Sequence, residues 1–126
     1  MSAFNRNAVW FRRGAPLLIA FAISGSALAQ GAPDKKTERL WKSKCASCHG
    51  ADGKGDTDQG KKMKVSNMAT AAYKKSKTDD QLKKAILEGV KTEKEGVKQE
   101  MDAYKGELAP EQVDALVQYI RAFPTS

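Results

Sequence analysis

The stretch Cys45-Ala-Ser-Cys-His49 concentrates the chemistry of this chain. It contains both cysteines and the single histidine among 126 residues. Two thiols and one imidazole at this spacing could form a disulfide or redox-active dithiol, supply ligands to a zinc ion, or attach a haem covalently. Each chemistry makes a different demand on the surrounding chain, so the other residues help to discriminate among the three.

Covalent haem attachment is the chemistry that agrees best with the rest of the sequence. A redox-active cysteine pair normally belongs to a strand-rich fold, and we find no alternating strand pattern. A structural zinc site needs a fourth ligand, and the adjacent Cys48 and His49 cannot easily face one tetrahedral ion. In a haem site, Cys45 and Cys48 each add to one vinyl group of the porphyrin, and His49 reaches the iron. The porphyrin would also give a small chain an apolar body to fold around.

The first 29 residues have the composition of a secretory signal peptide. Three arginines precede the apolar run 15–23, and small residues follow up to Ala27-Leu-Ala29. We therefore expect cleavage after Ala29, a mature domain of residues 30–126 and a periplasmic location. An uncleaved membrane anchor is the alternative, although the apolar run is short for a bilayer span.

The charge of the chain is positive but dispersed. The whole chain has a formal net charge of +7, and without the three arginines of residues 1–29 the mature charge is (22 − 3) − 15 = +4. Lysines alternate with acidic residues, and no arginine-and-aromatic stripe suggests nucleic-acid binding. Lys54, Lys61, Lys62 and Lys64 follow the haem motif. They could steer an acidic partner towards an exposed haem edge, or simply form a solvated loop.

Sequence patterns predict a mostly helical mature chain. Helices are expected over 37–46, 78–89 and 110–123, with loops over 50–60 and 91–100 and a loop with a helical turn over 61–73. A capping box at Thr78 and Gln81 begins the middle helix, and Gly89 suits its end. Pro110 begins the last helix, whose apolar positions share one face. The predicted fold class is all-α.

The order of these pieces resembles that of the small class I cytochromes c. Similar segments are Leu40-Trp41, Cys45-Ala-Ser-Cys-His-Gly-Ala-Asp-Gly-Lys-Gly55, Thr78 to Gly89, Met101-Asp-Ala-Tyr-Lys-Gly-Glu-Leu108, and Gln112 to Phe123. The resemblance covers essentially the whole mature chain. It implies the cytochrome c fold, with three to four short helices around one covalently attached haem c and the first and last helices crossing.

The resemblance also implies a set of site residues. Cys45 and Cys48 would hold the haem, His49 would be the proximal iron ligand, and Met101 the distal ligand. Met63 and Met68 are expected to fill core or loop space. Asp102 stands where the family usually has proline, so we expect a flexible strap and a Met101–iron bond that is easier to displace.

A second departure concerns the proximal histidine. Between Asp34 and Ala109 there is no proline whose carbonyl could accept the N–H of His49. Another backbone carbonyl is therefore expected to orient the ring.

These features predict a function in electron transfer. The expected protein is a periplasmic one-electron carrier between a membrane reductase and a terminal oxidase or other acceptor, with acidic redox partners and no substrate of its own. The alternative is a haem subunit of a small oxidoreductase, or a five-coordinate haem that binds gases or peroxide. A peroxide site would want a distal acid-base group, and the chain has no second histidine for that role.

Overall fold

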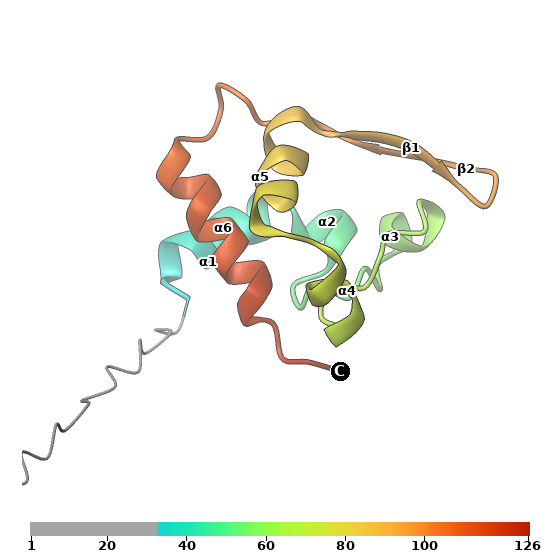
Figure 1. Ribbon diagram of the computed structural model, residues 1–126, viewed down its shortest axis with the longest axis horizontal. Coiled ribbons are helices and arrows are strands. Elements are labelled where there is room, and N and C mark those ends of the chain that lie inside the picture. The colour runs from blue at the N-terminus through green and yellow to red at the C-terminus, as the bar shows by residue number, and fades with distance from the viewer. Residues whose placement is uncertain (1–32) are drawn as a thin grey trace, which may run out of the picture.

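The computed structural model describes residues 33–126, and the predicted signal peptide over 1–29 lies outside them (Figure 1). The elements in chain order are α1 (Lys35–Lys44), α2 (Ala46–His49), α3 (Asp58–Lys62), α4 (Ala71–Ser76), α5 (Asp79–Glu88), β1 (Val90–Lys94), β2 (Val97–Met101) and α6 (Pro110–Ala122). Helices dominate this part of the chain, as predicted. Their number exceeds three to four because single-turn and two-turn segments add to the long ones. Within residues 33–126, no helix combines the length and hydrophobicity that a bilayer crossing requires.

Side-chain caps set where the helices begin. Asp34 accepts hydrogen bonds from the N–H groups of Lys36 and Thr37 at 2.7 and 2.8 Å, so α1 starts two residues before the predicted boundary. The predicted capping box is confirmed, because Thr78 N–H donates to Gln81 and Gln81 N–H donates back to the threonine hydroxyl. Gly89 ends α5 with φ 75°, in the left-handed region that favours glycine.

The core lies between α1, α5 and α6. The predicted apolar face of α6 is confirmed, since Val113, Leu116, Val117, Ile120 and Phe123 are all buried. Trp41 from α1 is 2% exposed, and its ring lies 5.2 Å from that of Phe123. The first and last helices contact and cross one another, as expected (Figure 1).

The prediction of a loop over 91–100 is wrong, because these residues form an antiparallel hairpin. Val90 pairs with Met101 at its base, and Lys94 pairs with Val97 next to the turn. The turn residues Glu95 and Gly96 have φ 52° and 75°, the paired positive values of a tight two-residue hairpin turn. Charged side chains dominate both strands, and only β2 alternates between half-buried and exposed positions.

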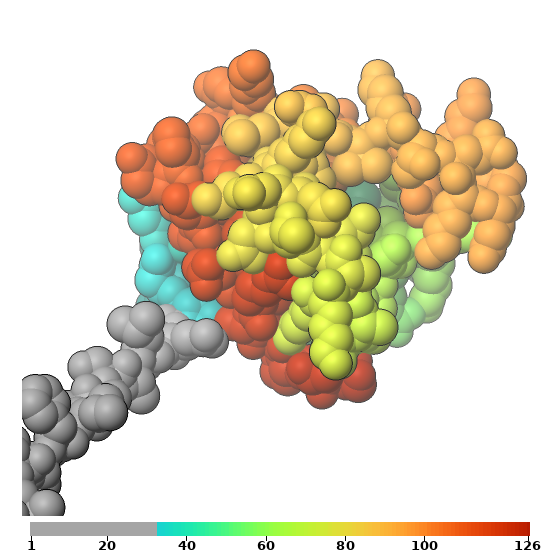
Figure 2. Space-filling model, in the orientation of Figure 1, coloured from blue at the N-terminus to red at the C-terminus, as the bar shows by residue number. Residues whose placement is uncertain are grey.

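The prediction for residues 61–73 is partly correct. Two short helices, α3 and α4, begin after the threonine caps Thr57 and Thr70, and α3 starts inside the stretch predicted as loop. The hairpin extends from the end of α5 across the molecule towards α3 (Figure 1). Figure 2 shows a hollow between the hairpin and the α4–α5 segment, with residues of the early part of the chain at its floor.

Candidate functional site

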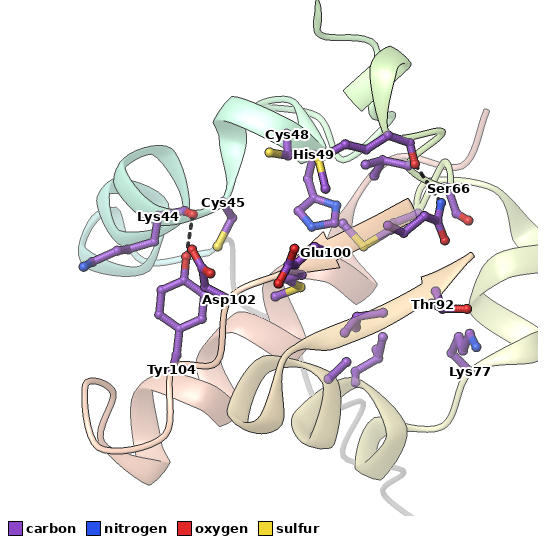
Figure 3. Close-up of a pocket in the computed structure, with 18 of the residues that line it drawn as sticks. Lys44, Cys45, Cys48, His49, Ser66, Lys77, Thr92, Glu100, Asp102 and Tyr104 are labelled. Atoms are coloured by element: carbon purple, nitrogen blue, oxygen red, sulfur yellow. Dashed lines mark hydrogen bonds between the residues drawn. The ribbon is translucent and has the colours of Figure 1, made fainter. Parts of the chain in front are cut away.

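A pocket of about 550 Å³ opens at this hollow. Its walls come from α2, the segment after α3, α5 and the hairpin. The lining residues include Cys45, Cys48, His49, Met63, Val65, Met68, Tyr73, Leu82, Ala85, Val90, Gln99, Met101 and Tyr104. This volume is in the range of sites that enclose a cofactor. The structure thus brings the four predicted site residues, Cys45, Cys48, His49 and Met101, to one pocket. Figure 3 shows the first three of them.

The short helix α2 is fixed in place by polar contacts to its backbone. Trp41 Nε1–H donates to the carbonyl of Gly50 at 2.9 Å, in a buried bond that ties α1 to the end of α2. The hydroxyl of Thr57 donates to the carbonyls of Ser47 and Cys48 at 2.9 and 3.1 Å. The cysteines and histidine are therefore presented by a segment that α1 and α3 hold from two sides.

Both thiols are free, and the environment of Cys45 does not suit redox cycling. Burial raises the pKa of Cys45 to about 11. Redox-active cysteine pairs need a lowered thiol pKa, because the thiolate is the reactive form. In the described part of the chain, no group of three or more His, Cys, Asp or Glu side chains could hold a metal ion. The raised pKa of Cys45 weakens the dithiol alternative.

The imidazole of His49 points into the pocket (Figure 3). Burial lowers the pKa of His49, which favours the neutral ring that can bind a metal. The ring packs against Trp41, with 5.9 Å between the centroids. Its Nδ1 is buried inside the protein, so Nε2 is the nitrogen available to a group in the pocket.

The predicted carbonyl partner of His49 is not found. Among the described residues, Nδ1 has no hydrogen-bond partner. The ring is held by packing on Trp41, whose own N–H is used to bind Gly50. The two ring planes are tilted by 42°, so Trp41 supports one side of the His49 ring while Nδ1 has no partner among the described residues.

Three methionines line the pocket. Met68 is 5% exposed and belongs to the hydrophobic core, as expected of a filler. Met63 follows α3 and contributes its side chain to the pocket wall. Met101 is the last residue of β2, so the expected flexible strap is in fact the base of the hairpin.

Two residues that connect the walls of the pocket, Gln99 and Tyr104, were not predicted from the sequence. Gln99 Nε2 donates to the carbonyls of Met63 and Lys64, each at 2.8 Å. The hydroxyl of Tyr104 donates to the carbonyl of Lys44 at 3.0 Å (Figure 3). The alternation of Val97, Gln99 and Met101 with charged residues could have indicated a strand that places Gln99 and Met101 on the same face. Nothing in the sequence indicates the second.

The lysines nearest the pocket differ from the predicted group. Lys61 pairs with Asp56 at 2.7 Å and Lys64 pairs with Glu95 at 2.6 Å, so half of the predicted cluster is paired with carboxylates. The pocket itself is lined by Lys44 and Lys77 together with the carboxylates Glu100 and Asp102, and Lys44 pairs with Glu107 at 3.2 Å. The charge that lines the pocket is therefore mixed, and its lysines lie at the ends of α1 and α4.

The site fits a c-type haem. Two free thiols, a neutral imidazole and apolar walls surround one cofactor-sized pocket, and the buried Nδ1 leaves the opposite ring nitrogen for iron. No curated protein gives a significant match to the chain. Among solved structures, the chain is similar to the c-type cytochrome KustC0563, with 30% identity and a TM-score of 0.59 over 71% of this chain and 98% of that one.

A mutant of the same cytochrome is similar to an equal degree. It shows 31% identity and a TM-score of 0.57, covering 69% of this chain and 96% of the mutant. The family model for cytochrome c matches residues 35–123, which include all the helices from α1 to α6 and the cysteine-histidine motif. Because that match extends over the whole folded part of the chain, the protein belongs to the cytochrome c family, whose members are electron carriers that bind haem c covalently.

Proposed function

We propose that this protein is a periplasmic one-electron carrier with His49 and Met101 as the axial ligands of its haem. Cys45 and Cys48 hold the haem through thioether bonds. The haem, when bound, supplies an iron that changes between two oxidation states, and sulfur ligation raises its potential. The observation that carries this proposal is the convergence of these four side chains on one pocket.

Met101 is the best placed of the three methionines. Helix α3 packs against α2, so Met63 starts from the wall that also carries His49. Met68 is packed in the core. Met101 comes instead from the hairpin, a separate wall of the pocket, so its thioether would reach a bound haem from a different wall than His49 does.

The chain's own residues enclose the cofactor and leave one side open. Leu82, Ala85 and Val90 supply part of the apolar lining of the pocket. The mouth between the hairpin and α4–α5 stays exposed (Figure 2). An electron can pass at this edge without any bond in a substrate being made or broken.

Visible spectroscopy of methionine variants tests the ligand assignment. In the ferric protein, Met101→Ala should abolish the weak red band of sulfur-to-iron charge transfer and open the iron to cyanide. Met63→Ala and Met68→Ala serve as controls and should retain the band. A wild-type ferric spectrum without this band would favour the five-coordinate alternative. Loss of the band in Met63→Ala with retention in Met101→Ala would assign the ligand to Met63.

We also propose that its redox partners are acidic proteins that approach the pocket mouth. Lys77 lines the pocket without a carboxylate partner among the described residues, and the expected mature charge is positive. Steering of this kind weakens as salt shortens the screening length to about 8 Å at physiological ionic strength. The bimolecular electron-transfer rate with an acidic partner should fall with salt, and fall less in Lys77→Gln. A rate that is flat in salt would exclude steering.

The location is tested by recovering the protein from its host. N-terminal sequencing of the periplasmic fraction should give a chain that starts at Gln30. Recovery of the uncleaved chain in membranes would show that residues 1–29 are an anchor instead.

A further inference from the structure

The hairpin that ends at Met101 is fastened to the opposite wall of the pocket. One face of its two strands carries the half-buried Val90, Val97, Gln99 and Met101 together with the exposed Thr92 and Lys94, whereas the other face is fully exposed. A two-stranded hairpin is marginally stable alone in water, so this element needs an anchor beyond its own ladder.

Gln99 supplies that anchor. Its single Nε2 group donates both hydrogens, one to the carbonyl of Met63 and one to that of Lys64, at 2.8 Å each and partly shielded from water. Two successive carbonyls can converge on one amide because Lys64 has φ 49°, in the left-handed region. This geometry belongs to the end of α3, where Val65 N–H bonds to Gly60 and Lys64 N–H bonds to Lys61.

The other link between these walls is weaker. Lys64 Nζ lies 2.6 Å from Glu95 Oε2 near the hairpin turn, but the carboxylate side chain is 67% exposed. Exposed ion pairs contribute little to stability because water and salt screen them. The two shielded hydrogen bonds of Gln99 are therefore the stronger connection between the hairpin and the segment after α3.

On its other side, the segment after Met101 is already fixed. Tyr104 N–H bonds to the carbonyl of Ile86 at 3.0 Å, and its hydroxyl bonds to the carbonyl of Lys44. Met101 thus lies between an anchor two residues before it and an anchor three residues after it. Only the first anchor depends on a side chain of the hairpin.

We propose that Gln99 is a positioning residue that holds Met101 over the haem by clamping β2 to the segment after α3. The proposal rests on Met101 being the distal ligand. In this role the clamp does what proline usually does at the position of Asp102, because it restricts the backbone next to the ligand. Without the clamp, the hairpin opens more often and the methionine leaves its place more often.

The test compares Gln99→Ala with a matched control, Lys98→Ala, in the haem-loaded protein. Lys98 is the neighbouring residue on the exposed face and makes no contact with the pocket wall. Cyanide binding to ferric haem reports how often the distal ligand is absent. We expect Gln99→Ala to bind cyanide about tenfold faster than wild type, the effect of losing the net contribution of two hydrogen bonds, and Lys98→Ala to match wild type.

A second variant and a second measurement separate the clamp from a general loss of structure. Gln99→Glu keeps the length of the side chain and removes both donors, so it should also bind cyanide faster. Hydrogen exchange should increase in 97–101 for both Gln99 variants while α5 and α6 stay protected.

The outcomes distinguish the two proposals. If Met101→Ala removes the sulfur-to-iron band but both Gln99 variants match Lys98→Ala in cyanide binding, the clamp is refuted and the ligand assignment stands. If Met101→Ala retains the band, the ligand assignment fails and the positioning role of Gln99 fails with it.

Discussion

Replacing Gly60 by alanine should destabilise the protein, although the usual effect of this change inside a helix is the opposite. Gly60 lies in α3 and packs against the segment that carries the haem motif. A Cβ atom added there would lie 2.2 Å from the carbonyl oxygen of Gly55 and 2.4 Å from that of Cys48. Both neighbours are backbone atoms, so neither can rotate away as a flexible side chain could.

Two opposing terms decide the size of the effect. Alanine is favoured over glycine in a helix interior by about 1 kcal/mol. Overpacking a well-filled site typically costs about 1–3 kcal/mol, and two backbone contacts this short belong at the upper end or beyond. We expect a net loss of about 2 kcal/mol in the free energy of unfolding. For a domain of this size that corresponds to a fall in Tm of about 8–16 °C.

Urea unfolding of the haem-loaded protein measures this change, followed by haem absorbance and far-ultraviolet circular dichroism. Gly96→Ala is the matched control. A Cβ at Gly96 meets nothing within 4 Å, so its cost is limited to the positive φ of 75°, about 1 kcal/mol. If Gly60→Ala unfolds at a higher urea concentration than wild type, helix propensity outweighs the close approach and the argument from packing is refuted.

Three further changes test other contacts. Trp41→Phe should cost about 1–3 kcal/mol in urea unfolding, because it removes the buried hydrogen bond to Gly50 and leaves space beside His49; an unchanged midpoint would contradict this. Arg121→Ala should cost about 2–3 kcal/mol in the same assay, since the guanidinium binds Asp79 and two carbonyls at the end of α4, and Arg121→Lys should recover only part because lysine lacks the planar geometry; full recovery would refute the geometric argument. The hydrogen bond from Lys64 holds the pKa of Glu95 below its ordinary value, so the ion pair should be lost as pH falls through that pKa. Lys64→Met should therefore raise the midpoint of the Glu95 titration measured by NMR, and an unchanged midpoint would show that the pair does not form in solution.

Sequence patterns predicted the elements whose signals are local and strong. The capping box at Thr78 and the apolar periodicity up to Phe123 locate α5 and α6 almost to the residue. The haem motif locates one wall of the pocket, because its chemistry requires the thiols and the imidazole to be adjacent. These features need no knowledge of the rest of the fold.

The short helices could not be predicted in the same way. Helices α3 and α4 have five and six residues, too few to show a period of 3.6. Their only local signals are the threonine caps at Thr57 and Thr70. Both helices are stabilised by tertiary contacts, such as the approach of Gly60 to Cys48, which sequence patterns do not report.

The hairpin was missed for a different physical reason. The face with the half-buried side chains also carries the exposed Thr92 and the polar Gln99, and the other face is charged, so the contrast between the two faces is small. The turn sequence Glu95-Gly96 lacks the asparagine or aspartate that usually marks a tight hairpin turn. A buried polar side chain such as Gln99 becomes understandable only once the carbonyls that it binds are located.

Gly89 connects the predictable part of the fold to the unpredictable part. Gly89 ends α5, and a glycine at the end of a helix can be recognised from the sequence. The structure adds a second constraint, because a Cβ at Gly89 would lie 2.4 Å from the carbonyl oxygen of Met101 and 3.0 Å from the nitrogen of Ala103. The backbone of the proposed ligand therefore rests directly on the end of the helix that lines the pocket. One glycine thus ends α5 and lets the base of the hairpin approach the pocket closely, so that Gly89, Gln99 and Tyr104 together determine where Met101 lies.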